Sequence, residues 1–93
     1  MLARNSFAQV RRNRRDSLLI ASDMLSYAVG GIGKTELMSK VGLSSAQLNR
    51  YMPSLIRSEL LEVRNYQRKP MYKTTAKGKN FLATLSTLIE LLS

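Results

Sequence analysis

Polar and apolar residues between positions 44 and 59 alternate with the spacing of an amphipathic helix. The face predicted to point inward consists of Leu48, Met52, Leu55, Ile56 and Glu59, with Tyr51 beside it. The opposite face carries hydroxyl, amide and guanidinium groups, at Gln47, Asn49, Arg50, Ser54 and Arg57, and Ser45 at the start of the helix is a further predicted contact residue. Side chains of these types hydrogen-bond to the edges of bases and to phosphate oxygens. We therefore predict that this face of the helix contacts a nucleic acid.

The charge of the chain points to the same kind of partner. The 93 residues include 15 Lys and Arg against 6 Asp and Glu, a formal net charge of +9. Apart from Lys34 and Lys40, the basic residues fall in three blocks: residues 1–15, the helix just described, and residues 64–79. Such a surface requires a polyanion, and nucleic acid is the first candidate. Neutralisation of phosphates by these blocks predicts strongly salt-dependent binding.

The composition excludes several other classes of site. The chain has no cysteine and no histidine, so it lacks disulfides, a thiolate nucleophile and the commonest general base. Because the six carboxylates are scattered, we predict no catalysis, no cofactor and no metal site. The chain is long enough for one domain. No apolar run approaches the length of a membrane-spanning helix, and no signal-peptide pattern follows the basic N-terminus, so we expect a cytoplasmic protein.

Two further helices are predicted before the polar one. The first covers residues 16–29 and is ended by the glycines at 30, 31 and 33, with Ile32 between them as a predicted core residue. The second covers residues 34–41. Gly42 suits the left-handed position that ends a helix, and Ser44-x-x-Gln47 matches a capping box that begins the third helix. Pro53 lies inside this third helix and predicts a local kink there.

The period changes after residue 60. Leu61 and Val63 alternate with charged residues, which predicts a strand, and residues 71–74 predict a second strand. The polar segment 65–70 between them is the predicted turn, so residues 60–75 form a β-hairpin with a basic tip. Thr75 then caps a last helix that runs to about Leu92.

This order of elements predicts an α+β, mostly helical winged helix-turn-helix: three helices, a two-stranded wing and a C-terminal dimerisation helix. We divide the chain into a basic arm (1–15), a DNA-binding domain (16–75) and the dimerisation helix (76–93). The third helix is expected to enter the major groove of double-stranded DNA. The wing is expected to contact the backbone or minor groove through Arg64, Arg68, Lys69 and Lys73. The arm is expected to contribute Arg11, Arg12, Arg14 and Arg15.

The last helix carries a wide apolar stripe. One row, at alternating steps of four and three residues, consists of Phe81, Leu85, Leu88 and Leu92, and a second row of Leu82 and Ile89. One row is expected to cover the protein's own first helix and to leave the other exposed. An exposed leucine row on a small domain marks a subunit interface, so we predict a homodimer through this helix.

The segment GKTELMSKVGLSSAQLNRYMPSL, followed by LLEV and by MYKTTAKGKNFL, resembles the small archaeal winged-helix transcriptional regulators and the related ten-kilodalton archaeal chromatin proteins. The resemblance extends from about Arg15 to Leu92. It rests on a KT pair, a short turn before LS, a tyrosine four residues before a leucine, and a threonine and Lys-Gly run into the last helix. It implies a DNA-binding dimer whose C-terminal helix pairs with that of its partner, in the chromatin relatives as an antiparallel coiled coil.

Some residues permit a second interpretation. The segment GGIGKT at 30–35 has the glycines, lysine and threonine of a phosphate-binding loop, but Ala28 stands where that loop has glycine and a helix precedes it. We interpret it as a turn between helices. Tyr51 and Tyr72 could stack on bases, but we expect them at the edge of the core, whereas Tyr66 is expected to be exposed beside the wing tip.

The function predicted from these observations is a DNA-binding transcriptional regulator, nucleoid-associated and without a small-molecule ligand. A chromatin protein that tolerates any sequence would share the fold and the charges. RNA binding is disfavoured because the chain has only two phenylalanines and no tryptophan to serve as stacking platforms. A winged helix that binds a protein is disfavoured by the concentrated positive charge.

Overall fold

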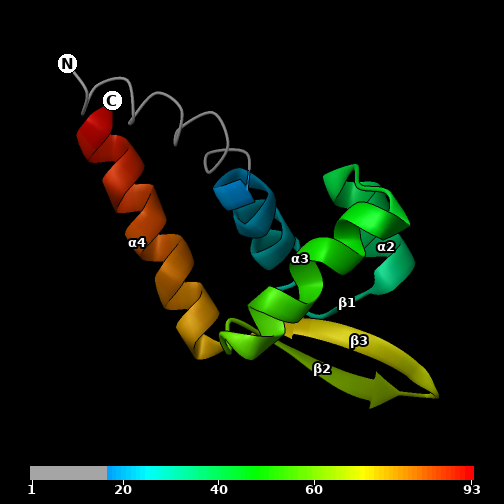
Figure 1. The fold of residues 1–93 in the computed structure, drawn as a ribbon. Helices are drawn as coiled ribbons and strands as arrows, with labels where there is room; N and C mark the ends of the chain where they lie inside the picture. Colours follow the sequence, from blue (N-terminus) through cyan, green and yellow to red (C-terminus); the bar gives the residue numbers. More distant parts are fainter. Residues whose placement is uncertain (1–16) are drawn as a thin grey trace.

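A computed structural model describes residues 17–93, so the arm and its arginines at 11, 12, 14 and 15 lie outside the described residues. Helix covers residues 17–27. The elements that follow are β1 (Ile32–Gly33), α2 (Lys34–Val41), α3 (Ser45–Arg57), β2 (Leu61–Tyr66), β3 (Lys69–Thr74) and α4 (Ala76–Leu92) (Figure 1). The helices α2 and α3 form the predicted helix-turn-helix, and β2 and β3 form the predicted wing.

The first helix ends two residues earlier than the sequence indicated. Residues 28–30 form a turn, in which the Gly31 amide donates to the Ala28 carbonyl at 3.0 Å. The same carbonyl also accepts a bond from the Thr74 amide at 2.9 Å. The prediction of helix to residue 29 was therefore wrong, because a tertiary bond to the end of β3 uses a carbonyl in this turn.

The sheet has one strand more than predicted. Its order is β1-β3-β2, and both pairs are antiparallel. Ile32 is buried as expected, and it stands opposite Tyr72, while Gly33 stands opposite Met71. The segment before α2 is therefore more than a turn: it attaches the start of the helix-turn-helix to the wing.

The turn between α2 and α3 follows the local rules of helix ends. Gly42 has a φ of 81°, the left-handed conformation that favours glycine, and its amide donates to the Met38 carbonyl at 2.8 Å. The predicted capping box is confirmed. The Gln47 amide donates to the Ser44 hydroxyl at 3.2 Å, and the Ser44 amide donates to Gln47 Oε1 at 2.9 Å. A cap of this kind stabilises a helix by about 1 kcal/mol.

Helix α3 ends two residues earlier than the helical spacing predicted. The helix continues through Pro53, whose ring is exposed, and ends at Arg57. Glu59, which we expected on the inward face of this helix, lies beyond its end and is exposed, with a φ of 62°. The error arose because the helical spacing was extended past the point where the backbone turns toward β2.

The wing closes in a tight two-residue turn. Tyr66 pairs with Lys69, which leaves Gln67 and Arg68 as the central residues, with φ of 51° and 69°. Positive φ at both positions is the signature of a type I′ turn, whose twist matches that of the flanking strands. The predicted turn at residues 65–70 is therefore shorter than expected, and Lys69 belongs to β3.

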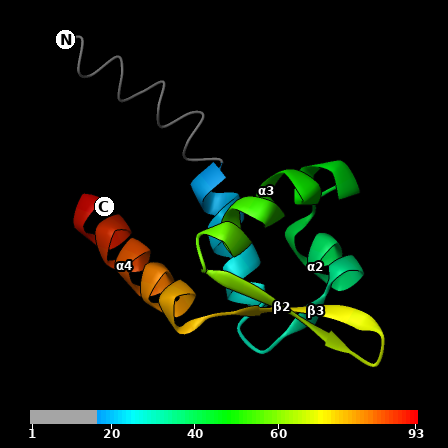
Figure 2. The same cartoon turned by 60° about the horizontal axis from the view of Figure 1, so that its bottom comes forward.

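The core lies between the first helix, α2, α3 and the root of the wing. Its buried members are Met24, Leu25, Ala28, Ile32, Leu37, Leu48, Met52, Leu55 and Leu61. Thr74 is the buried polar member among the described residues, and its hydroxyl donates to the Leu25 carbonyl at 2.5 Å. Together with the bond from its amide to Ala28, this contact attaches β3 to the first helix at the point where the chain enters α4 (Figure 2).

Candidate nucleic-acid interface

The outward face of α3 presents two arginines in one line. Leu48, Met52 and Leu55 are buried on the inward face, and Arg50 and Arg57 project from the opposite side, both exposed. Arg57 follows Arg50 by seven positions, which corresponds to two turns, or about 10.5 Å along the helix axis. This spacing allows both guanidinium groups to face one extended anionic partner.

The other predicted contact residues of α3 are also exposed; they are Ser45, Gln47, Asn49 and Ser54. At 100° per residue, Gln47 and Ser54 flank the arginine row on one side and Asn49 flanks it on the other. Gln47 also belongs to the capping box of α3, because its Oε1 accepts the bond from the Ser44 amide. Its side-chain NH₂ is therefore the group left to donate to a partner.

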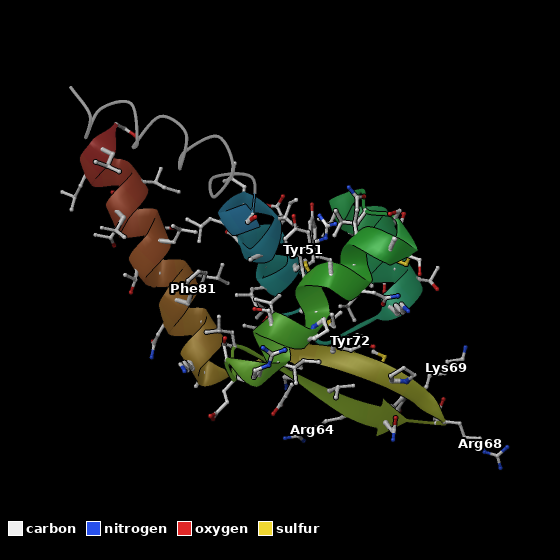
Figure 3. The ribbon with its side chains drawn as sticks, in the orientation of Figure 1. Tyr51, Arg64, Arg68, Lys69, Tyr72 and Phe81 are labelled. Carbon is white, nitrogen blue, oxygen red and sulfur yellow. The ribbon has the colours of Figure 1, made fainter. Side chains whose placement is uncertain are left out.

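The wing sorts its side chains onto two faces. The register places Arg64 opposite Met71, and Lys73 opposite Glu62, so these side chains lie on one face with Tyr66 and Lys69. Leu61, Val63, Tyr72 and Thr74 lie on the other face; Leu61 and Thr74 are buried and Tyr72 packs against the core, whereas Val63 is 45% exposed. The register therefore places three of the four predicted wing cations on the outer face. Arg68 stands at the tip of the wing (Figure 3).

The ion pair on this outer face is weak. Arg64 Nε lies 3.4 Å from Glu62 Oε1, and the Arg64 side chain is 74% exposed. Exposed pairs of this kind contribute little to stability because solvent screens them. Arg64 thus remains available for a stronger anionic partner.

The tyrosines occupy the predicted positions. Tyr51 and Tyr72 are half-buried and pack against the core, and Tyr66 is 64% exposed next to the tip. Tyr66 is therefore the tyrosine of the wing that stands free for contact with a partner.

The basic block at residues 64–79 divides into two parts with different surroundings. Lys73 and the other wing cations are exposed on the hairpin. The Lys77 ammonium instead donates to the Ser58 carbonyl at 2.9 Å. Charge counting missed this contact, because it links residues on two elements that are distant in sequence.

The domain covers both rows of the apolar stripe in the first half of α4 and neither row in the second half. Phe81 and Leu82 come from different rows, yet both pack against the core, and Leu85 is half-buried. Beyond them both rows are exposed, with Leu88 at 50%, Ile89 at 48% and Leu92 at 80%. The expectation of one covered and one exposed row was wrong, because the domain reaches only the first half of the helix.

The GGIGKT segment lacks the setting of a phosphate-binding loop. A helix and a turn precede it, Gly33 pairs in an antiparallel sheet, and Lys34 and Thr35 are the first residues of α2. Within residues 17–93, no cluster of carboxylates could hold a metal ion. In the same residues no helix is long and apolar enough to cross a membrane.

This chain is similar in sequence or structure to known winged-helix and DNA-binding proteins. The family model described as winged helix-turn-helix matches residues 14–93. The structure resembles Sso10a-2, a DNA-binding protein from Sulfolobus solfataricus, with a TM-score of 0.68, 20% identity, and coverage of 77% of this chain and 76% of that chain. It also resembles a predicted DNA-binding transcriptional regulator from E. coli, with a TM-score of 0.60, 18% identity, and coverage of 89% and 97%. No curated protein matches the chain significantly.

At these identities the two solved structures bear on the fold alone. They agree with the arrangement described above, in which α2 and α3 are followed by the β2–β3 hairpin and a long last helix. The family match covers the whole described chain. This chain therefore belongs to the winged helix-turn-helix family.

Proposed function

We propose that this protein binds double-stranded DNA and regulates transcription by occupying its site. The observation that carries the proposal is the pair of exposed arginines, Arg50 and Arg57, on the solvent face of the second helix of a helix-turn-helix. A helix of this kind fits the major groove, where arginine can bind the O6 and N7 atoms of guanine with two hydrogen bonds. The names of both similar structures, which include DNA binding, support the proposal.

The wing would hold the backbone or enter the minor groove beside α3. Its outer face carries Arg64, Lys69 and Lys73, and its tip carries Arg68. Cations at these positions neutralise phosphates, so they add affinity without depending strongly on sequence. Glu62 is the one acidic residue on the wing in the described part of the chain, and its carboxylate already lies beside Arg64.

We further propose that the protein acts as a homodimer through α4. The exposed half of this helix continues the same apolar stripe that the first half buries in its own domain. Between residues 80 and 93 the sole charged residue is Glu90, so a second copy would meet a nearly uncharged surface. Two copies related by a twofold axis would present two α3 helices to a pseudo-palindromic site.

Replacing Leu88 with serine should weaken this dimer about 30-fold, because each protomer loses about 1 kcal/mol of apolar burial from a side chain that is already half exposed. Sedimentation equilibrium over a series of protein concentrations measures the change. The matched control is Leu91→Ser, since Leu91 lies off the stripe and is 76% exposed. Equal self-association of the two variants would contradict the assignment of the stripe as the interface.

The experiment that tests the function is selection of the purified protein on a random duplex library at near-physiological salt. Enrichment of an inverted repeat is the expected result, and its half-site spacing gives the distance between the two α3 helices. Retention of duplex without enrichment would instead indicate a chromatin-type protein held mainly by phosphates. Loss of all duplex at this salt concentration would overturn the proposal.

A further inference from the structure

Three consecutive carbonyls after α3 are bonded to the first residues of α4. The Lys77 ammonium donates to the Ser58 carbonyl at 2.9 Å, and the Thr75 hydroxyl donates to the Glu59 carbonyl at 2.6 Å. The Thr75 amide donates to the Leu60 carbonyl at 3.1 Å. We call residues 58–60 together with residues 75–78 the α3–α4 junction. It holds the end of one helix directly against the start of the other.

The packing at the junction leaves little freedom. Gly78 is buried, and a Cβ at this position would collide with the Leu60 carbonyl oxygen. The Thr75 hydroxyl also accepts a bond from the Gly78 amide at 3.0 Å, so one side chain both caps α4 and binds the segment after α3. Glu59 is held there at positive φ, a conformation that costs a non-glycine residue about 1 kcal/mol.

The contact made by Lys77 suits the charge of its partner. Ser58 is the C-terminal cap of α3, and carbonyls at the end of a helix carry partial negative charge. An ammonium group is therefore well matched to this position. Lys79, two residues farther along, has the same charge, and its ammonium makes no hydrogen bond with any residue in the range 17–93.

We propose that Lys77 and Thr75 are positioning residues that fix the angle between α3 and α4. In a dimer held together by α4, this angle would determine the distance between the two α3 helices, and so the half-site spacing that the protein accepts. This second step rests on the proposed function. The junction joins the element that would hold the second copy to the element that would hold the DNA.

A change in this angle can be detected as a change in the distance between two introduced cysteines, because the chain has no cysteine of its own. Nitroxide labels at Ala46→Cys on α3 and Ser86→Cys on α4, both exposed, report an intramolecular distance by pulsed electron paramagnetic resonance. Labelled chains are diluted into unlabelled chains, so that distances between two copies do not contribute. We expect a single narrow distance distribution for the otherwise unchanged protein.

The decisive variant is Lys77→Met, which keeps the aliphatic stem and removes the bond to Ser58. We expect it to broaden or shift the distribution, Lys77→Arg to restore it, and Lys79→Met to leave it unchanged. Thr75→Val, which removes both the bond to Glu59 and the cap of α4, should broaden it as well. Circular dichroism of each variant confirms that the helices remain folded. A distribution in folded Lys77→Met and Thr75→Val as narrow as the original would overturn the inference.

The consequence for DNA is measured on duplexes that carry two selected half-sites at spacings changed one base pair at a time. We expect Lys77→Met to lower the preference for the best spacing roughly two- to tenfold, the range of one net hydrogen bond, with unchanged affinity for a single half-site. Equal loss at every spacing would show that Lys77 serves DNA affinity and would overturn its role in spacing. If even the original protein showed no spacing preference, the proposed dimeric function would fail, while the distance measurement would still decide the role of the junction.

Discussion

Gly78→Ala is expected to destabilise the protein by about 3 kcal/mol, at the upper end of what overpacking usually costs. The added methyl group would collide with the Leu60 carbonyl oxygen and would lie 2.6 Å from the Thr74 Cγ2 atom. A flexible side chain could move away, but the carbonyl belongs to the backbone and is bonded to the Thr75 amide. Urea unfolding followed by circular dichroism at 222 nm measures the change in the free energy of unfolding.

Gly30→Ala is the matched control for this prediction. Gly30 has no heavy atom within 4 Å of the position of an added Cβ, and its φ is not in the left-handed region. Alanine at this position should therefore change the stability by no more than about 0.5 kcal/mol. Similar unfolding midpoints for the two alanine variants would show that the contact between α4 and residue 60 is looser than described.

The double substitution Arg50→Ala with Arg68→Ala is expected to lower the affinity for the selected duplex about 1000-fold. In a dimer the change removes four guanidinium groups, and each contributes at least about 1 kcal/mol when it binds a base or a phosphate. Both side chains are exposed, so the fold itself should retain its stability. Fluorescence anisotropy with a labelled duplex measures the affinity at several salt concentrations.

The salt series shows how many of the contacts removed by the double substitution were made to phosphates. Loss of a phosphate contact lowers the slope of log affinity against log salt by about 0.9, whereas loss of a base contact leaves the slope nearly unchanged. Lys34→Ala with Lys40→Ala removes the same charge from α2, outside the three basic blocks, and should cost much less affinity. If this control weakened binding as strongly as the arginine pair, net charge alone would explain the affinity, and the assigned contacts would be wrong.

Much of the fold follows from local signals in the sequence. The capping box of Ser44 with Gln47 and the left-handed Gly42 placed the turn between α2 and α3 correctly. Thr75 was correctly assigned as the cap of α4. Each of these features depends on residues within one or two turns of one another, so the pattern contains the information needed to predict them.

The features that were missed depend on partners distant in sequence. The strand β1 has two residues, too few for an alternating pattern, and it exists because Ile32 meets Tyr72. The sequence indicates only that Thr74 lies in a strand, yet its hydroxyl donates to the carbonyl of Leu25 in the first helix. The same is true of the site: exposure along α3 followed from its periodicity, but the contact of Lys77 with Ser58 did not.

The turn at the tip of the wing has a consequence for the order in which the chain folds. Gln67 and Arg68 both adopt positive φ, where glycine or asparagine is usual. The turn is therefore unfavourable on its own, and the isolated hairpin should form slowly. The turn between α2 and α3, by contrast, is formed from contacts close in sequence, which close at little entropic cost. We therefore expect the wing to form late, after the helices have provided the surface on which β2 and β3 align. Interactions that form after the transition state change mainly the unfolding rate, so glycine at position 68 should slow unfolding and leave the refolding rate nearly unchanged, as stopped-flow measurements can show.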